Sequence, residues 1–294
     1  MSSEKKTIVV TGASDGIGLE AASQLAKQGH HVVLVGRNPA KVRAAEKRIR
    51  HESPGVPLES FRCDFSQLNN VRRLAGDLLT SYPRIDVLVN NAGTVFDKRQ
   101  LTDDGIEATF AVDHLAGFLL TELLLERIVA SAPARIVTTS SVAHFSATMD
   151  FDDLGFEHGY KIMRAYGRSK LANVLYTRHL ARRLEGTGVT ANCLHPGAVA
   201  TNIWSGAPRF ARPILAVGKK LFMISPATGG ERIAYLATSP EVEGRTGGYY
   251  VQDELEEPAD LARDDAVGER LVEVSRELVG LGAPADEDEA TSGR

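Results

Sequence analysis

The sequence predicts a single α/β domain in which a doubly wound, seven-stranded parallel sheet is covered by helices on both faces. Two observations lead to this fold class. Short runs rich in β-branched residues alternate along the whole chain with longer segments of helical periodicity. In addition, a glycine-rich turn follows the first of these runs and leads straight into an amphipathic segment.

The strands are expected where short apolar runs are bounded by polar or turn-forming residues. They lie at residues 7–10, 31–35, 58–63, 85–90, 135–139, 190–194 and 248–251. Helices are expected between them, and one start is marked by Asn38 followed by Pro39, a capping residue with proline at the first helical position. The run Glu254 to Glu257 is expected to be a solvated loop.

The unbroken alternation predicts one catalytic domain over residues 1–282, with no linker and no repeat. Two segments depart from it. Residues 200–225 mix apolar and basic side chains, and the acidic, small-residue tail 283–294 is expected to be disordered.

Composition excludes several classes of protein. With 294 residues, 43% hydrophobic and 24% charged, the chain can bury a large core. A formal net charge of -4 gives no basic surface for nucleic acid. Cys63 and Cys193 lie far apart in apolar runs, which predicts buried thiols in a reducing compartment. Neither a signal peptide nor a transmembrane segment is recognised, so cytoplasmic residence is expected.

The glycine-rich turn has the spacing of a dinucleotide phosphate site, which identifies the predicted sheet as a Rossmann fold. Glycine lets the backbone approach a pyrophosphate, and amides at a helix N-terminus meet its charge. The expected contacts are Gly12, Ser14, Asp15, Gly16, Ile17 and Gly18.

The end of the second strand bears on the choice of nucleotide. Arg37 and Asn38 follow it at the place where an NAD site carries a ribose-binding carboxylate. Arg37 can pair with a 2′-phosphate, which favours NADP(H), although NAD(H) stays possible. A solvated arginine is the plainer alternative, and Asp15 near the phosphates argues against the extra negative charge.

Polar side chains also follow the third and fourth predicted strands. Ligands of open α/β sheets bind outside the carboxyl ends of the strands, so these residues are candidate cofactor contacts, although each alone fits a turn or a cap. They are Asp64, Phe65, Asn90, Asn91, Ala92 and Gly93.

A candidate proton-transfer centre lies after the fifth strand. Ser141 ends that strand, and Tyr166 and Lys170 stand at i and i+4 on one face of a helix. Carbonyl reduction needs a proton donor for the developing alkoxide, and a neighbouring ammonium is expected to lower the pKa of a phenol. On their spacing alone, the tyrosine and lysine fit an ordinary surface pair.

These motifs together resemble the short-chain dehydrogenase/reductase family over about residues 7–281, and its retinol dehydrogenase-like branch in particular. The TGxxxGxG turn, NNAG, the strand-five serine and YxxxK occur in the family's order, followed by PGAVAT. The resemblance implies that Ser141, Tyr166 and Lys170 are catalytic and that Lys170 also holds the nicotinamide ribose. It implies that the nicotinamide is flanked by Pro196, Gly197, Val199 and Thr201.

Two positions depart from the family pattern. Asp113 stands in a Val-Asp-His-Leu segment where the family carries an asparagine that organises a proton-relay water. An aspartate can accept a hydrogen bond from that water but cannot donate one, so altered pH dependence is expected. Thr138 replaces another common asparagine, on strand five, and is expected to be a packing difference.

The predicted function is hydride transfer between NADP(H) and a lipophilic ketone or aldehyde, or the corresponding alcohol. Segment 200–225 is expected to cover the nicotinamide, although it also fits core packing or contact with a partner subunit or a membrane surface. No metal site is expected, and His144 and His195 are expected to be structural. The alternatives are a redox-sensing nucleotide-binding protein and a methyltransferase. The oligomeric state stays open.

Overall fold

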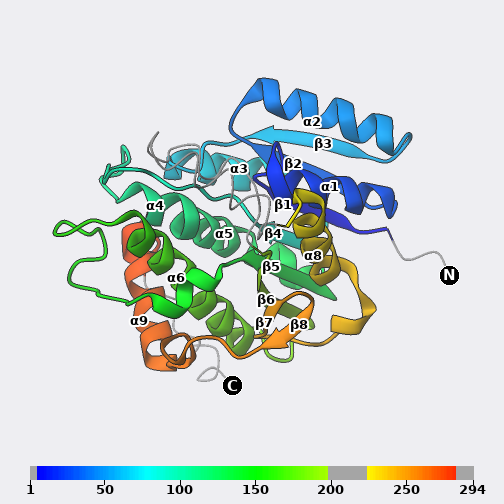
Figure 1. The fold of residues 1–294 in the computed structure, drawn as a ribbon. Coiled ribbons are helices and arrows are strands. Elements are labelled where there is room, and N and C mark those ends of the chain that lie inside the picture. Colours follow the sequence, from blue (N-terminus) through cyan, green and yellow to red (C-terminus); the bar gives the residue numbers. More distant parts are fainter. Residues whose placement is uncertain (1–4, 198–223, 283–294) are drawn as a thin grey trace, which may run out of the picture.

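The computed structural model describes residues 5–197 and 224–282, which form one α/β domain (Figure 1). Val199, Thr201 and the tail 283–294 lie outside the described residues. The same holds for segment 200–225, apart from its last two residues.

The strands form one sheet in the order β3-β2-β1-β4-β5-β6-β7-β8. Strands β1 to β7 are parallel throughout, and β8 alone runs antiparallel to its neighbour. Their bounds are β1 (Thr7–Thr11), β2 (His31–Gly36), β3 (Leu58–Arg62), β4 (Val87–Asn90), β5 (Ala134–Thr139), β6 (Val189–His195), β7 (Tyr249–Val251) and β8 (Glu254–Glu256).

The predicted fold class is confirmed, but the sheet has eight strands where seven were expected. The run expected as a loop after the last parallel strand forms β8, which remains fully exposed. Gln252 and Asp253 both adopt positive φ and make a two-residue hairpin turn. This turn carries neither glycine nor asparagine, so its sequence gave little sign of a hairpin.

Helices cover both faces of the sheet (Figure 1). Helices α1, α2 and α8 pack on one face, and α3, α5, α6 and α9 on the other. The helix bounds are α1 (Gly16–Lys27), α2 (Pro39–Glu52), α3 (Leu68–Ser81), α4 (Ala108–Phe110), α5 (Ala116–Ala130), α6 (Ile162–Arg183), α8 (Pro226–Thr238) and α9 (Asp265–Leu278). The short elements are the π-helix η1 (Ala111–Leu115) and the 3₁₀ helices η2 (Val142–Ser146), η4 (Pro240–Val242) and η5 (Asp260–Arg263).

The segments α4, η1 and α5 form one continuous helix, Ala108–Ala130, that is long and apolar enough to cross a membrane by length and composition. No segment of that kind was expected from the sequence. In the fold, 78% of the most apolar 18-residue stretch of this helix is buried. The helix lies in the core between the sheet and its neighbours, which accounts for its apolar character.

The strand order places the candidate site. Strand β1 pairs with β2 on one side and with β4 on the other, so the chain reverses its direction of winding between β1 and β4. Ligand crevices of doubly wound sheets lie at this switch point. The carboxyl ends of β1, β4 and β5 meet there.

Candidate active site

The turn after β1 requires glycine at two positions for different reasons. Gly12 has φ +68°, and a Cβ there would lie 2.9 Å from Ala92 Cα. A Cβ on Gly18 would lie 2.4 Å from the Gly12 carbonyl oxygen. The first turn of α1 therefore packs directly against the backbone beside it, which leaves its amides close to the sheet edge.

Hydrogen bonds from Thr11 fix the Asn91-Ala92 segment beside this turn. The Thr11 hydroxyl accepts from the Asn91 amide at 2.9 Å and the Ala92 amide at 3.0 Å, and it donates to the Val89 carbonyl at 3.1 Å. Asn91 Nδ2 donates to the Thr11 carbonyl at 2.9 Å. The ends of β1 and β4 are thus held as one rigid unit.

Several side chains predicted to contact the cofactor also make contacts within the protein at the strand ends. Asn90 Nδ2 donates to Thr121 Oγ1 at 2.8 Å, inside the fold. Asp64 Oδ1 accepts from the amide and the hydroxyl of Ser66, and Phe65 lies in the core. Asn38 caps α2, as its sequence predicts. Asn90 Oδ1 has no hydrogen-bond partner among the described residues, so this oxygen stays available to a ligand.

The exposed side of the turn fits an anionic nucleotide. Arg37 is exposed and makes no hydrogen bond or ion pair with other described residues, which leaves its guanidinium available to a phosphate. Asp15 Oδ1 accepts from the Gly16 amide at 2.8 Å, and Asp15 Oδ2 lies 2.6 Å from Lys41 Nζ. This ion pair offsets the aspartate charge that the sequence placed near the phosphates. The first-turn amides of α1 lack intrahelical partners, as at any helix N-terminus.

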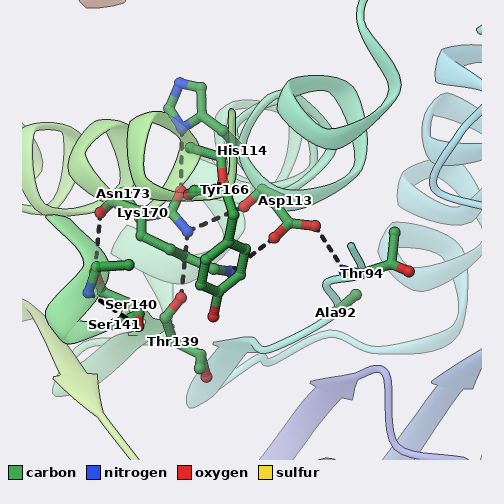
Figure 2. Close-up of polar contacts among 12 residues, drawn as sticks. Ala92, Thr94, Asp113, His114, Thr139, Ser140, Ser141, Tyr166, Lys170 and Asn173 are labelled. Atoms are coloured by element: carbon green, nitrogen blue, oxygen red, sulfur yellow. Dashed lines mark hydrogen bonds and ion pairs between the residues drawn. The ribbon is translucent and has the colours of Figure 1, made fainter. Parts of the chain in front are cut away.

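Tyr166 and Lys170 lie on the face of α6 that meets the end of β5 (Figure 2). Lys170 Nζ is 5.3 Å from the centre of the Tyr166 ring. Ser141 forms a side-chain hydrogen bond with Tyr166 and caps η2 by accepting from the Ala143 amide at 3.2 Å. Ser140 is fully buried and donates to the Lys170 carbonyl at 2.8 Å, so Ser141 is the serine that faces the tyrosine.

Asp113 contacts Lys170 directly, which the sequence did not indicate. Its Oδ2 is 3.1 Å from Lys170 Nζ, and its Oδ1 accepts from the Thr94 amide at 2.7 Å. The side chains of this pair are 0% and 4% exposed. Asp113 lies on η1, and π-helical turns of this kind are frequent at functional sites.

Burial dominates the pKa of the proton-transfer groups. It raises the pKa of Tyr166 above its ordinary value, with a further rise from Asp113, and outweighs the lowering by Lys170 and Ser141. The ammonium therefore acts in the expected direction, but the net shift is upward. Burial opposes the charge on Lys170, yet Asp113 and Tyr166 raise its pKa overall. Burial also raises the pKa of Asp113, against Lys170 and the Thr94 amide.

A buried hydrogen-bond chain behind these groups was missed by sequence reasoning. Asn173 Nδ2 donates to the carbonyls of Asp113 and Thr139 at 3.0 and 3.2 Å, and its Oδ1 lies 3.1 Å from His114 Nδ1. His114 Nε2 lies 3.1 Å from Ser275 Oγ on α9. The amide oxygen of Asn173 can only accept a hydrogen bond, so His114 Nδ1 donates to it. His114 Nε2 then accepts from the Ser275 hydroxyl. No spacing in the sequence connects these three residues.

The two histidines expected to be structural make no catalytic arrangement. His144 Nε2 accepts from the Ala259 amide at 3.1 Å, so its Nδ1 donates to the Ser141 carbonyl at 2.7 Å. Burial lowers the pKa of His195 to about 4, which keeps this ring neutral. Among the residues that the structure describes, no cluster of His, Cys, Asp or Glu could hold a metal ion.

Arg232 on α8 supports the segment after β6 and was not anticipated. Its Nη1 donates to the Pro196 carbonyl at 2.9 Å. Gly197 has φ +104°, and a Cβ there would lie 2.5 Å from Ile224 Cδ1. Pro196 and Gly197 therefore make a tightly packed turn at the same sheet edge. Because Arg232 lies 36 positions from Pro196 along the chain, the local sequence gives no sign of this hydrogen bond.

The arrangement can hold a substrate oxygen and move one proton. Ser141 and Tyr166 present hydroxyls at the end of β5, and Lys170 supplies positive charge behind them. The glycine turn and Arg37 lie along the same edge of the sheet, where a dinucleotide would place its phosphates.

A family model described as short chain dehydrogenase matches residues 6–210. Human retinol dehydrogenase 14 is 40% identical over 291 residues, with 94% of this chain and 87% of that protein covered. Human retinol dehydrogenase 13 is 39% identical over 285 residues, covering 95% of this chain and 86% of that protein.

The same likeness extends to solved structures. An actinorhodin polyketide ketoreductase determined with NADPH superimposes with a TM-score of 0.67 at 26% identity, covering 84% of this chain and 95% of that one. The similarity spans the fold on which the glycine turn and the Tyr166 helix are built.

Proposed function

This chain belongs to the short-chain dehydrogenase/reductase family, in its retinol dehydrogenase-like branch, and we propose that it is an NADP(H)-dependent oxidoreductase of lipophilic ketones and aldehydes or the corresponding alcohols. The observation that carries this proposal is the joint placement of Ser141, Tyr166 and Lys170 at the switch-point edge of the sheet, beside the glycine turn.

The preference for NADP(H) is supported by Arg37. Its guanidinium has no partner among the described residues and stands at the end of β2, where the adenosine ribose of a bound nucleotide lies in Rossmann folds. The polyketide ketoreductase of the same fold was solved with NADPH. Asp15, the residue that argued against an added phosphate, is paired with Lys41.

A lipophilic substrate is supported by exposed apolar side chains that lie close to Ser141 or Tyr166 along the chain. Val142 and Phe145 on η2 are 49% and 52% exposed, and Met163, one turn before Tyr166 on α6, is 51% exposed. Exposed large apolar side chains gathered near polar reacting groups are typical of a site for an apolar molecule. Two relatives are named retinol dehydrogenases, in keeping with such a substrate.

Each residue of the site has a distinct task in the reaction. A bound nicotinamide supplies or accepts the hydride. Ser141 holds the substrate oxygen, and Tyr166 donates its proton to that oxygen during reduction and takes it back during oxidation. Lys170 stabilises the phenolate that this transfer leaves. Asn173 and Ser140 fix the backbone of the segments that carry these groups.

Replacement of the phenol tests the proposal. In Tyr166→Phe, turnover of a ketone and aldehyde panel is expected to fall by at least about a hundredfold, since general acid catalysis contributes that much. NADPH affinity, measured by fluorescence titration, should stay within a few-fold of the parent. Tyr235→Phe is the matched control, because the hydroxyl of Tyr235 on α8 donates a hydrogen bond to Glu241 on η4, at the surface of the protein. Retained turnover in Tyr166→Phe, or a parent protein that binds no NADPH, would refute the proposal.

We also propose that the protein works in the cytoplasm. Both cysteines of the chain are buried and free, as the sequence predicted, which suits a reducing compartment. Fractionation of cells that produce the protein, followed by immunodetection, tests this placement.

A further inference from the structure

We infer that Asp113 is a positioning residue that keeps the proton on Tyr166 to higher pH and so extends the pH range in which the phenol can donate a proton for carbonyl reduction. The inference rests on the proposed function and specifies the pH dependence of the same reaction. It stands on the contact between Asp113 Oδ2 and Lys170 Nζ at 3.1 Å and on the burial of both side chains.

The geometry holds Asp113 in place from two sides. Asp113 Oδ1 accepts from the Thr94 amide at 2.7 Å, which favours the ionised carboxylate. Gly93 makes room for the contact, because a Cβ at that position would lie 3.3 Å from both Asp113 Oδ2 and Lys170 Nζ. The carboxylate is therefore fitted against the ammonium (Figure 2).

The net charge of the cluster formed by Asp113, Lys170 and Tyr166 decides how readily the cluster loses a proton. With the carboxylate ionised, the lysine charged and the phenol protonated, Asp113, Lys170 and Tyr166 sum to zero. Loss of one proton then leaves a net negative charge in a site with little water. With a neutral residue at position 113, the same loss takes the cluster from positive to neutral, which costs less free energy. This holds for the coupled group as a whole, whichever residue releases the proton.

Other ionisable groups around the cluster leave this balance unchanged. His114 lies next to Asp113, and burial lowers its pKa to about 4, so it is neutral. Glu107 at the start of α4 and the Tyr160 phenol also feel the Asp113 charge. Burial raises the pKa of both, and neither contacts Lys170 within the described structure.

The consequence for catalysis is a change in the pH dependence of the reaction. Reduction uses the phenol form of Tyr166, and oxidation uses the phenolate. A cluster that keeps its proton to higher pH supplies the reductive form over a wider range and the oxidative form over a narrower one. Asp113 thus moves the pH range in which reduction proceeds upward, without touching the substrate.

The test compares the parent with Asp113→Asn, which keeps the shape of the side chain and an oxygen for the Thr94 amide. Tyrosinate absorbance is titrated against pH in each protein and in its Tyr166→Phe counterpart, and the difference isolates the phenol at position 166. We expect the ionisation midpoint to move down by about one pH unit or more in Asp113→Asn. The pH above which kcat/KM for reduction declines should move down by a similar amount.

Asp86→Asn is the matched control. Asp86 is also a buried aspartate in an ion pair, 2.7 Å from Arg84 Nη2, but it lies just before β4, at the opposite edge of the sheet. This variant should leave the Tyr166 titration and the pH profile of reduction unchanged. Circular dichroism at each pH separates ionisation from unfolding.

Coincident titrations of the parent and Asp113→Asn, or a shift to higher pH, would overturn the inference. The titration needs neither cofactor nor substrate. A parent that ionises normally but turns over no carbonyl compound would therefore count against the proposed function and not against the role of Asp113.

Discussion

At the residue scale, the proposed preference for NADP(H) rests on the side chain at position 37. Arg37 is exposed at the end of β2 and has no partner among the described residues, whereas Asp15 is paired with Lys41. A free guanidinium can pair with the two oxygens of a 2′-phosphate in a planar, bidentate contact. An unphosphorylated ribose offers no such contact.

Arg37→Ala should therefore weaken NADPH binding far more than NADH binding. A charge-assisted contact of this kind contributes about 1.5–3 kcal/mol, so the dissociation constant for NADPH is expected to rise roughly tenfold to a hundredfold. Fluorescence titration of both nucleotides on the parent and the variant measures the difference. Equal losses for NADPH and NADH would show that Arg37 does not contact the phosphate.

At the scale of elements, the glycine turn proposed to bind the nucleotide depends on the close packing of α1 against α8. A Cβ on Gly230 of α8 would lie 2.6 Å from the Ala21 amide and 2.6 Å from Glu20 Cβ. The two helix backbones therefore approach each other more closely than any side chain permits. Since α1 begins in the glycine turn, a shift of this contact would be transmitted to that turn.

Gly230→Ala is expected to lower the free energy of unfolding by about 1–3 kcal/mol, because the added methyl group forces the helices apart. Urea denaturation measures this loss. Gly76→Ala on α3 is the control, since nothing lies within 4 Å of a Cβ there. It should stabilise the protein by about 0.5–1 kcal/mol through helix propensity. Equal effects in the two variants would contradict a tight α1 and α8 contact.

At the scale of the whole molecule, the C-terminal helix α9 is joined to the site by the chain Ser275, His114 and Asn173. His114 is 1% exposed and accepts from Ser275, which requires a neutral ring. Burial lowers its pKa from 6.5 to about 4. His114 is therefore the ionisable member of the hydrogen-bond chain that links α9 to the backbone carbonyls of Asp113 and Thr139.

The stability of the domain should accordingly fall as the pH drops from 6.5 toward 4. In this window the unfolded histidine binds a proton and the folded one does not, so protons favour the unfolded chain. His114 alone can account for a loss of roughly 3 kcal/mol across the window. Urea denaturation at a series of pH values gives the slope. His114→Gln should flatten it, while His51→Gln, at an exposed position of α2, should not. An unchanged slope in His114→Gln would contradict a neutral buried ring.

The sequence by itself determined the fold class and the location of the site. Alternating β-branched runs and helical segments can bury their apolar faces in few ways, and a doubly wound sheet is the one that suits parallel strands. The carboxyl ends of such strands must then lie along one edge, so the glycine turn, Ser141 and the Tyr166 helix could be brought together from their order alone. The i and i+4 spacing of Tyr166 and Lys170 fixed their shared face.

Only the tertiary structure decided the contacts that set the chemistry of this edge. The ion pair between Asp113 and Lys170 joins residues 57 positions apart, and Ser275 reaches His114 from the last helix. It also placed Asn90 Nδ2 on Thr121 and Phe65 in the core, contacts that the sequence did not indicate. The upward pKa shift of Tyr166 follows from burial, which outweighs the lysine charge that the sequence displays. Local spacing specifies which side chains share an element, whereas burial and partner choice depend on how distant elements pack.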